Sequence, residues 1–155
     1  MNTINYNFKK HIELLNHQKN ILSQNKSFFK ENQAECLELS EYNAIIDRHI
    51  FWKNRFEVAL LLQTFIKKEM SPEKFRDNIF KLRYNHIEQC KKFQEKLISG
   101  EIEKFVPNEQ SYKLKGFLST LYFECKNFKM GSDEKVFYNS IQNGFLNLQI
   151  ILNEE

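Results

Sequence analysis

Residues 71–100, SPEKFRDNIFKLRYNHIEQCKKFQEKLISG, decide the fold class of this chain. Ser71 offers a hydroxyl that accepts from a free N–H group at a helix start, and Pro72 fits the first turn, where an N–H is not needed. Gly100 is the residue type that most often ends a helix. The apolar residues between them recur mainly in steps of three and four: Phe75, Ile79, Leu82, Phe93 and Leu97. This pattern predicts one long amphipathic helix over residues 71–99.

The flanking sequence repeats the helical pattern. Apolar stripes predict helices over residues 41–68, 111–128 and 132–153, with Gly131 and Ser132 separating the last two. The apolar run from Val58 to Leu62 in the first of them suggests a centrally buried segment, and the mixed stretch DRHIFWKNRFE is expected to bend or interrupt that helix.

Residues 4–22 carry a weaker stripe, and residues 23–40 are polar and aperiodic. We therefore expect an all-α fold, an antiparallel bundle of four main helices plus an N-terminal helix. Residues 1–40 would form the N-terminal helix and a polar linker, and residues 41–155 the helical bundle domain.

Composition supports this fold class and restricts the setting. The 155 residues include only 4 Gly and 2 Pro, too few for a turn-rich β-sandwich. Cys36, Cys90 and Cys125 are an odd number without CxxC spacing, which favours a reducing compartment over a disulfide framework. No apolar run approaches the ~18–20 residues of a membrane span. We also expect a protein that is not secreted, because the N-terminus lacks the apolar core of a signal peptide.

The densest mixture of aromatic and charged residues is a candidate recognition patch, made of Arg48, His49, Trp52 and Arg55. Tryptophan and arginine dominate the binding energy of protein interfaces. The alternative is a turn inside the helix with one anchored Trp52 and solvated charges.

A basic face on the predicted helix 71–99 is a second candidate. Its residues are Lys74, Arg76, Lys81, Arg83, Lys91, Lys92 and Lys96. Lysine and arginine add salt-dependent contacts to phosphates, so this face indicates weak nucleic-acid binding. Glu73, Asp77, Glu88 and Glu95 alternate with it, which is equally typical of an exposed, salt-bridged helix.

Acidic residues near the chain's C-terminal third form a third candidate, an acidic patch for a basic protein partner. Its members are Glu101, Glu103, Glu124 and Asp133, with Glu109 nearby. The alternative is ordinary solvated loop charge.

His86 and Cys90 are four residues apart and share one helix face, the spacing of two metal ligands or of a base beside a thiolate. The same positions fill a gap in the apolar stripe, which favours a structural role. No phosphate-binding glycine loop, nucleophile elbow, HExxH or paired-carboxylate motif appears. We therefore expect no enzyme activity, no cofactor and no metal site.

Four segments carry a resemblance to a known family: FEVALLLQTFIKKEMSPEKFRDNIFKLR, EIEKFVPNE, LSTLYFECKNF and FYNSIQNGFLNLQIIL. Over residues 56–152 the chain resembles helical open reading frames of algal plastids and, more remotely, the colicin D-type immunity proteins. The resemblance implies a helical inhibitor that presents acidic side chains to a tRNA-cleaving toxin domain. Glu124 and Asp133 are the acids that fall in the matching segments.

Together these observations predict a non-enzymatic helical protein-binding module of the immunity-protein type, with a protein partner such as a basic nuclease-like domain. The alternative is an RNA- or DNA-associated accessory protein that uses the basic face of helix 71–99. The resemblance places the protein in a plastid (chloroplast) if it is organelle-encoded, and otherwise in a bacterial cytoplasm.

Overall fold

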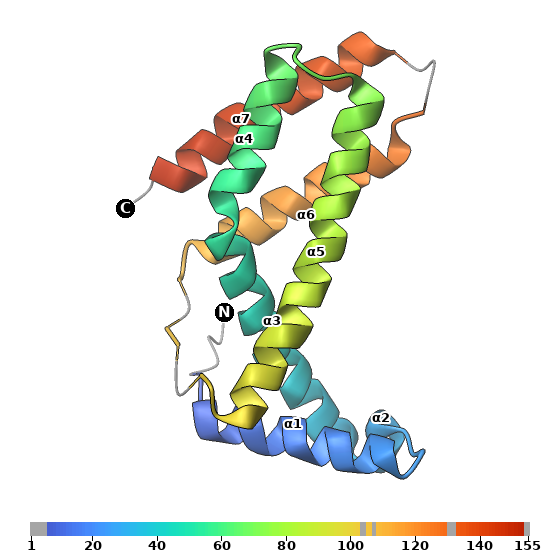
Figure 1. Ribbon diagram of the computed structural model, residues 1–155, viewed down its shortest axis with the longest axis vertical. Coiled ribbons are helices and arrows are strands. Elements are labelled where there is room, and N and C mark those ends of the chain that lie inside the picture. The colour runs from blue at the N-terminus through green and yellow to red at the C-terminus, as the bar shows by residue number, and fades with distance from the viewer. Residues whose placement is uncertain (1–5, 103–104, 107, 130–132, 154–155) are drawn as a thin grey trace. The chain divides into compact units, whose positions relative to one another are not determined.

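The computed structural model describes residues 6–102, 105–106, 108–129 and 133–153, and in these residues the chain forms seven α-helices and no strand (Figure 1). None of the described helices is long and apolar enough to cross a membrane. The helices are α1 (Phe8–Ser23), α2 (Phe28–Glu31), α3 (Gln33–Lys53), α4 (Arg55–Ile66), α5 (Pro72–Ser99), α6 (Ser111–Asn127) and α7 (Glu134–Asn153). The all-α prediction is confirmed, but the helices are more numerous than the predicted four plus one.

One additional helix arises because the predicted helix 41–68 is interrupted at Asn54, inside the mixed stretch that was expected to bend it. Asn54 adopts φ −96° and ψ 10°. Its N–H still donates to the carbonyls of Ile50 and Phe51, at 3.2 and 3.1 Å, so α3 ends in a tightened turn. Asparagine is a poor helix interior residue because its amide competes for backbone hydrogen bonds.

The segment expected to be a polar linker, residues 23–40, contains α2 and the first two turns of α3. Ser27 Oγ accepts from the N–H of Lys30 at 3.4 Å, and Asn32 Oδ1 accepts from the N–H of Glu35 at 3.1 Å. The polar residues that suggested a linker are therefore helix N-caps. Residues 23–40 contain too few apolar residues at helical spacing to show an apolar stripe.

Both ends of α5 form as the sequence predicts. Ser71 Oγ accepts from the N–H of Lys74 at 3.2 Å, which satisfies one free donor of the first turn. At the other end Gly100 has φ +80°, and the N–H of Ile102 reaches back to the carbonyl of Lys96 at 3.2 Å. This left-handed turn is the one that glycine adopts without strain. The predicted stop at Gly131 and Ser132 lies outside the described residues.

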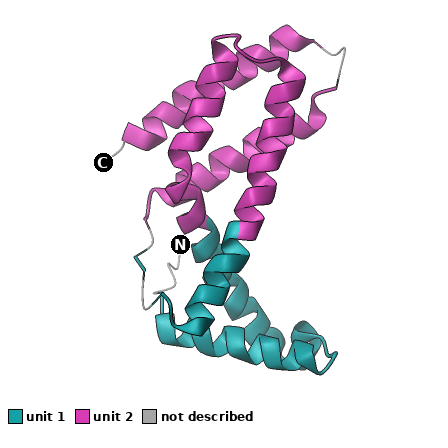
Figure 2. Ribbon diagram, in the orientation of Figure 1, with its two compact units in different colours: residues 1–47, 89–107 teal, residues 48–88, 108–155 magenta. Residues whose placement is uncertain are grey.

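The chain divides into two compact units, which Figure 2 shows in different colours. The first unit comprises residues 1–47 and 89–107, and the second residues 48–88 and 108–155. The predicted boundary at residue 40 differs from this division. In the first unit, α2 packs on α1. Its buried apolar side chains are Leu14, Leu15, Ile21, Phe28, Leu39, Tyr42, Ile45, Ile46, Phe93 and Leu97.

The second unit is organised around α7, which packs against both α4 and α6. Aromatic rings fill one end of its core. Phe65 stacks on Phe75 with ring centroids 4.4 Å apart, and Phe128 stacks on Phe137 at 4.3 Å. The Tyr138 hydroxyl donates to the carbonyl of Ile66, which joins α7 to the end of α4. The remaining buried apolar residues include Val58, Leu62, Ile79, Leu114, Leu118, Leu121, Ile141 and Leu148.

The buried residues of α5, α6 and α7 recur along the predicted stripes, but several apolar residues of the predicted helices lie at the surface. Phe56, Leu60 and Val136 are 64%, 62% and 63% exposed, and Phe80 and Ile87, which widen the apolar stripe of α5, are 38% and 46% exposed. In α4, Val58, Leu62 and Phe65 occupy the buried face. An apolar run of five consecutive residues covers more than a full helical turn, so part of it must point away from the core.

Leu60 and Leu62 test which face of α4 is buried, because the two positions carry the same residue type on the same helix. Leu62→Ala removes a side chain with no exposure and is expected to lower the free energy of unfolding by about 2–5 kcal/mol. Leu60→Ala is expected to change it by less than about 0.5 kcal/mol. Urea denaturation of both variants measures the difference, and equal losses would show that the phase of α4 is incorrect.

Candidate functional sites

The predicted recognition patch lies at the junction of α3 and α4, where arginine side chains rest on aromatic rings. The Arg48 guanidinium lies 3.5 Å from the ring centre of Tyr112. The Arg55 guanidinium lies 4.3 Å from the ring of Phe56 and 4.6 Å from that of Trp52. We call these five residues the aromatic–arginine surface. All five belong to the second unit.

The helix break at Asn54 explains how Arg55 reaches Trp52. Arg55 Nη1 donates to the carbonyl oxygen of Trp52 at 2.8 Å, one of the acceptors that the end of α3 leaves without a partner in the helix. This bond and the two ring contacts hold the guanidinium in one place. A guanidinium carries five N–H donors, so most of its donors remain to bind another group.

A hollow of about 520 Å³ adjoins this surface. Trp52, Arg55 and Phe56 form one side, and the chain entering α6 forms the other, together with Leu152. The entering residues are polar: Asn108, Glu109 and Gln110. Asn108 Oδ1 accepts from the N–H of Gln110 at 2.8 Å, which fixes that turn. The hollow thus combines ring faces, cationic donors, amide groups and one carboxylate within one site.

His49, the fourth residue of the predicted patch, is half-buried. Burial lowers the pKa of its imidazole, and the ammonium of Lys53 lowers it further. His49 is therefore neutral at pH 7 and adds no positive charge to the surface.

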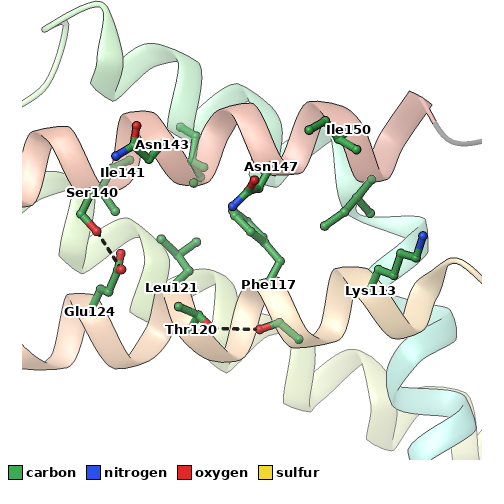
Figure 3. Close-up of a pocket in the computed structure, with 14 residues that line it drawn as sticks. Lys113, Phe117, Thr120, Leu121, Glu124, Ser140, Ile141, Asn143, Asn147 and Ile150 are labelled. Carbon is green, nitrogen blue, oxygen red and sulfur yellow. Dashed lines mark hydrogen bonds between the residues drawn. The ribbon is translucent and has the colours of Figure 1, made fainter.

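A groove of about 600 Å³ runs between α6 and α7 (Figure 3), and Leu62 of α4 also lines it. Phe117, Leu121 and Ile141 supply its apolar interior. Lys113 lies at one end and Glu124 at the other, where Ser140 Oγ donates to Glu124 Oε1 at 2.7 Å. We call this feature the α6–α7 groove. This groove was not predicted from the sequence.

The acidic residues predicted to form one patch belong to separate parts of the chain. Glu124 and Asp133 both border a hollow of about 330 Å³ that also includes Phe123 and Val136. Asp133 Oδ1 accepts from the N–H groups of Lys135 and Val136, at 3.1 and 3.3 Å, and so caps α7. Glu101 is exposed and belongs to the first unit, and Glu103 lies outside the described residues.

The basic side chains of α5 are mostly exposed, as predicted. Arg76 lies beside Asp77, with Nη2 and Oδ1 3.5 Å apart, and the Arg83 guanidinium lies 5.3 Å from the ring centre of Tyr122. Exposed aromatic side chains accompany Lys81 and Arg83 on this helix, namely Phe80 at 38% and Tyr84 at 64% exposure.

His86 and Cys90 each have an environment that explains the residue without a catalytic role. The His86 imidazole is buried and stacks on Phe51, with ring centroids 3.5 Å apart and planes 4° from parallel. Burial raises the pKa of the Cys90 thiol to about 12, and the charge of Asp47 adds to the rise. The thiolate form that a nucleophile needs is therefore strongly disfavoured at neutral pH.

A buried polar network in the first unit was not predicted. His11 has no exposed surface. Its Nδ1 lies 2.9 Å from Tyr6 Oη, and its Nε2 lies 3.1 Å from Asn43 Oδ1, which also accepts from Gln94 Nε2 at 3.2 Å. Because Asn43 Oδ1 acts as an acceptor, Nε2 carries the proton and Nδ1 accepts from Tyr6. The neutral imidazole is then fully hydrogen-bonded, and burial lowers its pKa.

The residues that sequence reasoning missed share one feature: the chain brings them together over long separations. Phe56 was assigned to the core, whereas Tyr112 and Gly116 were not singled out. Gly116 and Gly144 could have been noticed in the sequence. A glycine inside a predicted helix lowers the stability of that helix, so its presence indicates a packing or functional reason. Both line the α6–α7 groove.

No protein-family model matches this sequence, and comparison with curated proteins and with solved structures also finds no match. The resemblance to colicin D-type immunity proteins therefore stays a prediction.

His11 predicts a pH-dependent stability. The unfolded imidazole binds a proton near pH 6.5 and the folded one does so only at lower pH, so stability falls as pH drops below about 6.5. Between pH 7.5 and 5.5, His11→Gln should reduce this fall by up to about 1.4 kcal/mol, whatever its effect at pH 7.5. Urea titrations at each pH measure the slope. An unchanged slope in the variant would contradict the buried neutral imidazole.

Cys90 predicts slow alkylation. With a pKa of about 12, fewer than about one thiol in a thousand is ionised at pH 8.5. Iodoacetamide should therefore modify Cys90 at least a hundredfold more slowly than free cysteine, as followed by peptide mass spectrometry. A rate close to that of free cysteine would reveal an activated thiol and revive the catalytic or metal-binding interpretation.

Proposed function

We propose that this chain is a non-enzymatic protein-binding module whose contact surface is the aromatic–arginine surface. The observation that carries the proposal is the fixed position of two guanidinium groups on exposed or half-exposed rings, Arg48 on Tyr112 and Arg55 between Trp52 and Phe56. Tryptophan, tyrosine and arginine are the residue types in which interface binding energy concentrates.

Preorganisation supports this use. A long arginine side chain normally loses conformational entropy when it is immobilised in a complex, at about 0.5–1.5 kcal/mol per side chain. The ring contacts and the bond from Arg55 to the Trp52 carbonyl already restrict that freedom. The adjoining hollow offers a place for a partner side chain to be buried, and its amides and Glu109 can satisfy polar groups at the rim.

The immunity-protein resemblance places protein binding on acidic residues instead. Its support in the structure is the hollow bordered by Glu124 and Asp133, with Phe123 exposed beside them. Asp133 already caps α7, so of these two carboxylates only Glu124 is left to bind a partner. For this reason the aromatic–arginine surface is the better candidate.

Nucleic-acid binding through α5 is the second candidate function. The specific observation in its favour is the placement of exposed Phe80 and Tyr84 among Lys81 and Arg83. Single-stranded nucleic acids stack their bases on such rings and pair their phosphates with such cations. Its binding would weaken steeply with salt.

Three phenylalanine and tyrosine substitutions separate these functions. Phe56, Phe123 and Tyr84 are 64%, 66% and 64% exposed, so replacing each with alanine should leave stability within about 0.5 kcal/mol of wild type. If the aromatic–arginine surface is the contact, Phe56→Ala should weaken capture of the native partner by about 30-fold, the effect of losing a hot spot worth about 2 kcal/mol. Phe123→Ala and Tyr84→Ala should have little effect.

The measurement is quantitative capture from extracts of the native source on immobilised wild-type and variant proteins, with RNase-treated and high-salt arms. Loss of a protein partner with Phe123→Ala and not with Phe56→Ala would contradict the proposed surface and favour the acidic hollow. Recovery of RNA alone, lost at high salt and with Tyr84→Ala, would contradict protein binding and favour the nucleic-acid function.

A further inference from the structure

The α6–α7 groove is a separate feature from the aromatic–arginine surface, because its lining includes none of the five residues of that surface. Two neighbouring helices, α6 and α7, supply most of its lining, and α4 contributes Leu62. In Figure 3, Phe117, Leu121 and Ile141 lie along its length, and Lys113 and Glu124 mark opposite ends. An apolar channel between two helices is the geometry into which the side chains of another helix pack.

Gly116 is the residue that keeps this groove open. A Cβ added at Gly116 would meet no atom within 4 Å, whereas one at Gly144 would lie 3.4 Å from the ring of Phe117. The first position faces open space and the second would make an ordinary van der Waals contact, so packing inside the chain requires glycine at neither position. Glycine in a helix interior lowers helix stability relative to alanine, and one of its uses is the close approach of another group to the backbone.

The dimensions of the groove match a short helix. Lys113 and Glu124 are eleven positions apart on α6, which corresponds to about 16 Å of helix axis. A partner helix of about three turns spans that length. Apolar side chains at positions i, i+4 and i+7 of such a helix would face the interior of the groove. Asn143 and Asn147, four residues apart and exposed on α7, provide amide groups along the rim.

The charges at the two ends of the groove determine which way a partner helix would run. Lys113 places a cation at one end of the groove, and Glu124 places a carboxylate at the other. A helix carries its acidic residues most favourably in the first turn and its basic residues in the last turn. A partner helix with that distribution complements both ends of the groove at once.

We infer that the α6–α7 groove binds an amphipathic helix of a partner protein, with a carboxylate of that helix beside Lys113 and a cationic side chain beside Glu124. This interaction is independent of the aromatic–arginine surface. The chain then has a second contact site. This site binds a helix, whereas the hollow beside the aromatic–arginine surface buries a single partner side chain.

The test uses fluorescein-labelled 14-residue peptides with leucines at i, i+4, i+7 and i+11 on a helical alanine and glutamine background. One peptide has glutamates in the first turn and lysines in the last; two others have glutamates at both ends or lysines at both ends. Fluorescence anisotropy should show the mixed-ended peptide binding at least threefold more tightly than either uniform peptide at low salt, with the preference shrinking at high salt.

Gly116→Leu fills the groove without removing any contact, and leucine is a better helix former than glycine, so the variant should fold. Gly116→Leu is expected to lower the affinity for the mixed-ended peptide at least tenfold. Ser119→Leu is the matched control, because Ser119 is exposed on the same helix and its side chain does not line the groove. It should change the affinity less than twofold, and Phe56→Ala should do the same.

Four outcomes would overturn the inference. The first is equal affinity of the wild-type protein and Gly116→Leu for the mixed-ended peptide, and the second is equal affinity of all three peptides for the wild type. The third is self-association of the wild-type chain in sedimentation that Gly116→Leu abolishes, because a second copy would then be the occupant. Loss of peptide binding with Phe56→Ala alone would place the peptide on the aromatic–arginine surface and would also contradict the groove.

Discussion

The packing of α7 against both α4 and α6 is the contact on which the second unit depends. Phe137 joins the aromatic end of the core by stacking on Phe128, and Leu148 buries its side chain completely further along the helix. The same helix supplies one wall of the α6–α7 groove, and its Leu152 reaches the hollow beside Trp52. Both candidate contact sites therefore rest on a helix whose position the apolar core determines.

The interruption at Asn54 has the complementary role of directing polar groups outward. A continuous helix from residue 41 to 68 would satisfy the Trp52 carbonyl within its own backbone ladder. Because α3 ends at Lys53, that carbonyl accepts from Arg55 instead, and the guanidinium comes to rest on Trp52 and Phe56. The break in the helix at Asn54 thus fixes the Arg55 guanidinium against two aromatic rings.

The fold class and most helix positions could be predicted because their signals are local: the cap at Ser71, the stop at Gly100 and the stripe through Phe75 and Ile79 all act within one helix. The structured part of residues 23–40 was missed because Ser27 and Asn32 have the composition of a linker and the function of caps. The core position expected for Phe56 was wrong because an apolar run cannot show which face meets the neighbouring helix. Arg48, Trp52 and Arg55 could be singled out from their residue types and spacing, whereas Tyr112 meets Arg48 only through the tertiary fold.

Proton NMR of the free protein measures whether Arg55 is held between the rings of Trp52 and Phe56 before any partner binds. Protons above an aromatic ring resonate upfield, so the δ-methylene resonances of Arg55 should lie upfield of their random-coil positions. They should move back towards those positions in Trp52→Leu and in Phe56→Ala. Random-coil shifts for Arg55 in the wild-type protein would contradict a preorganised aromatic–arginine surface.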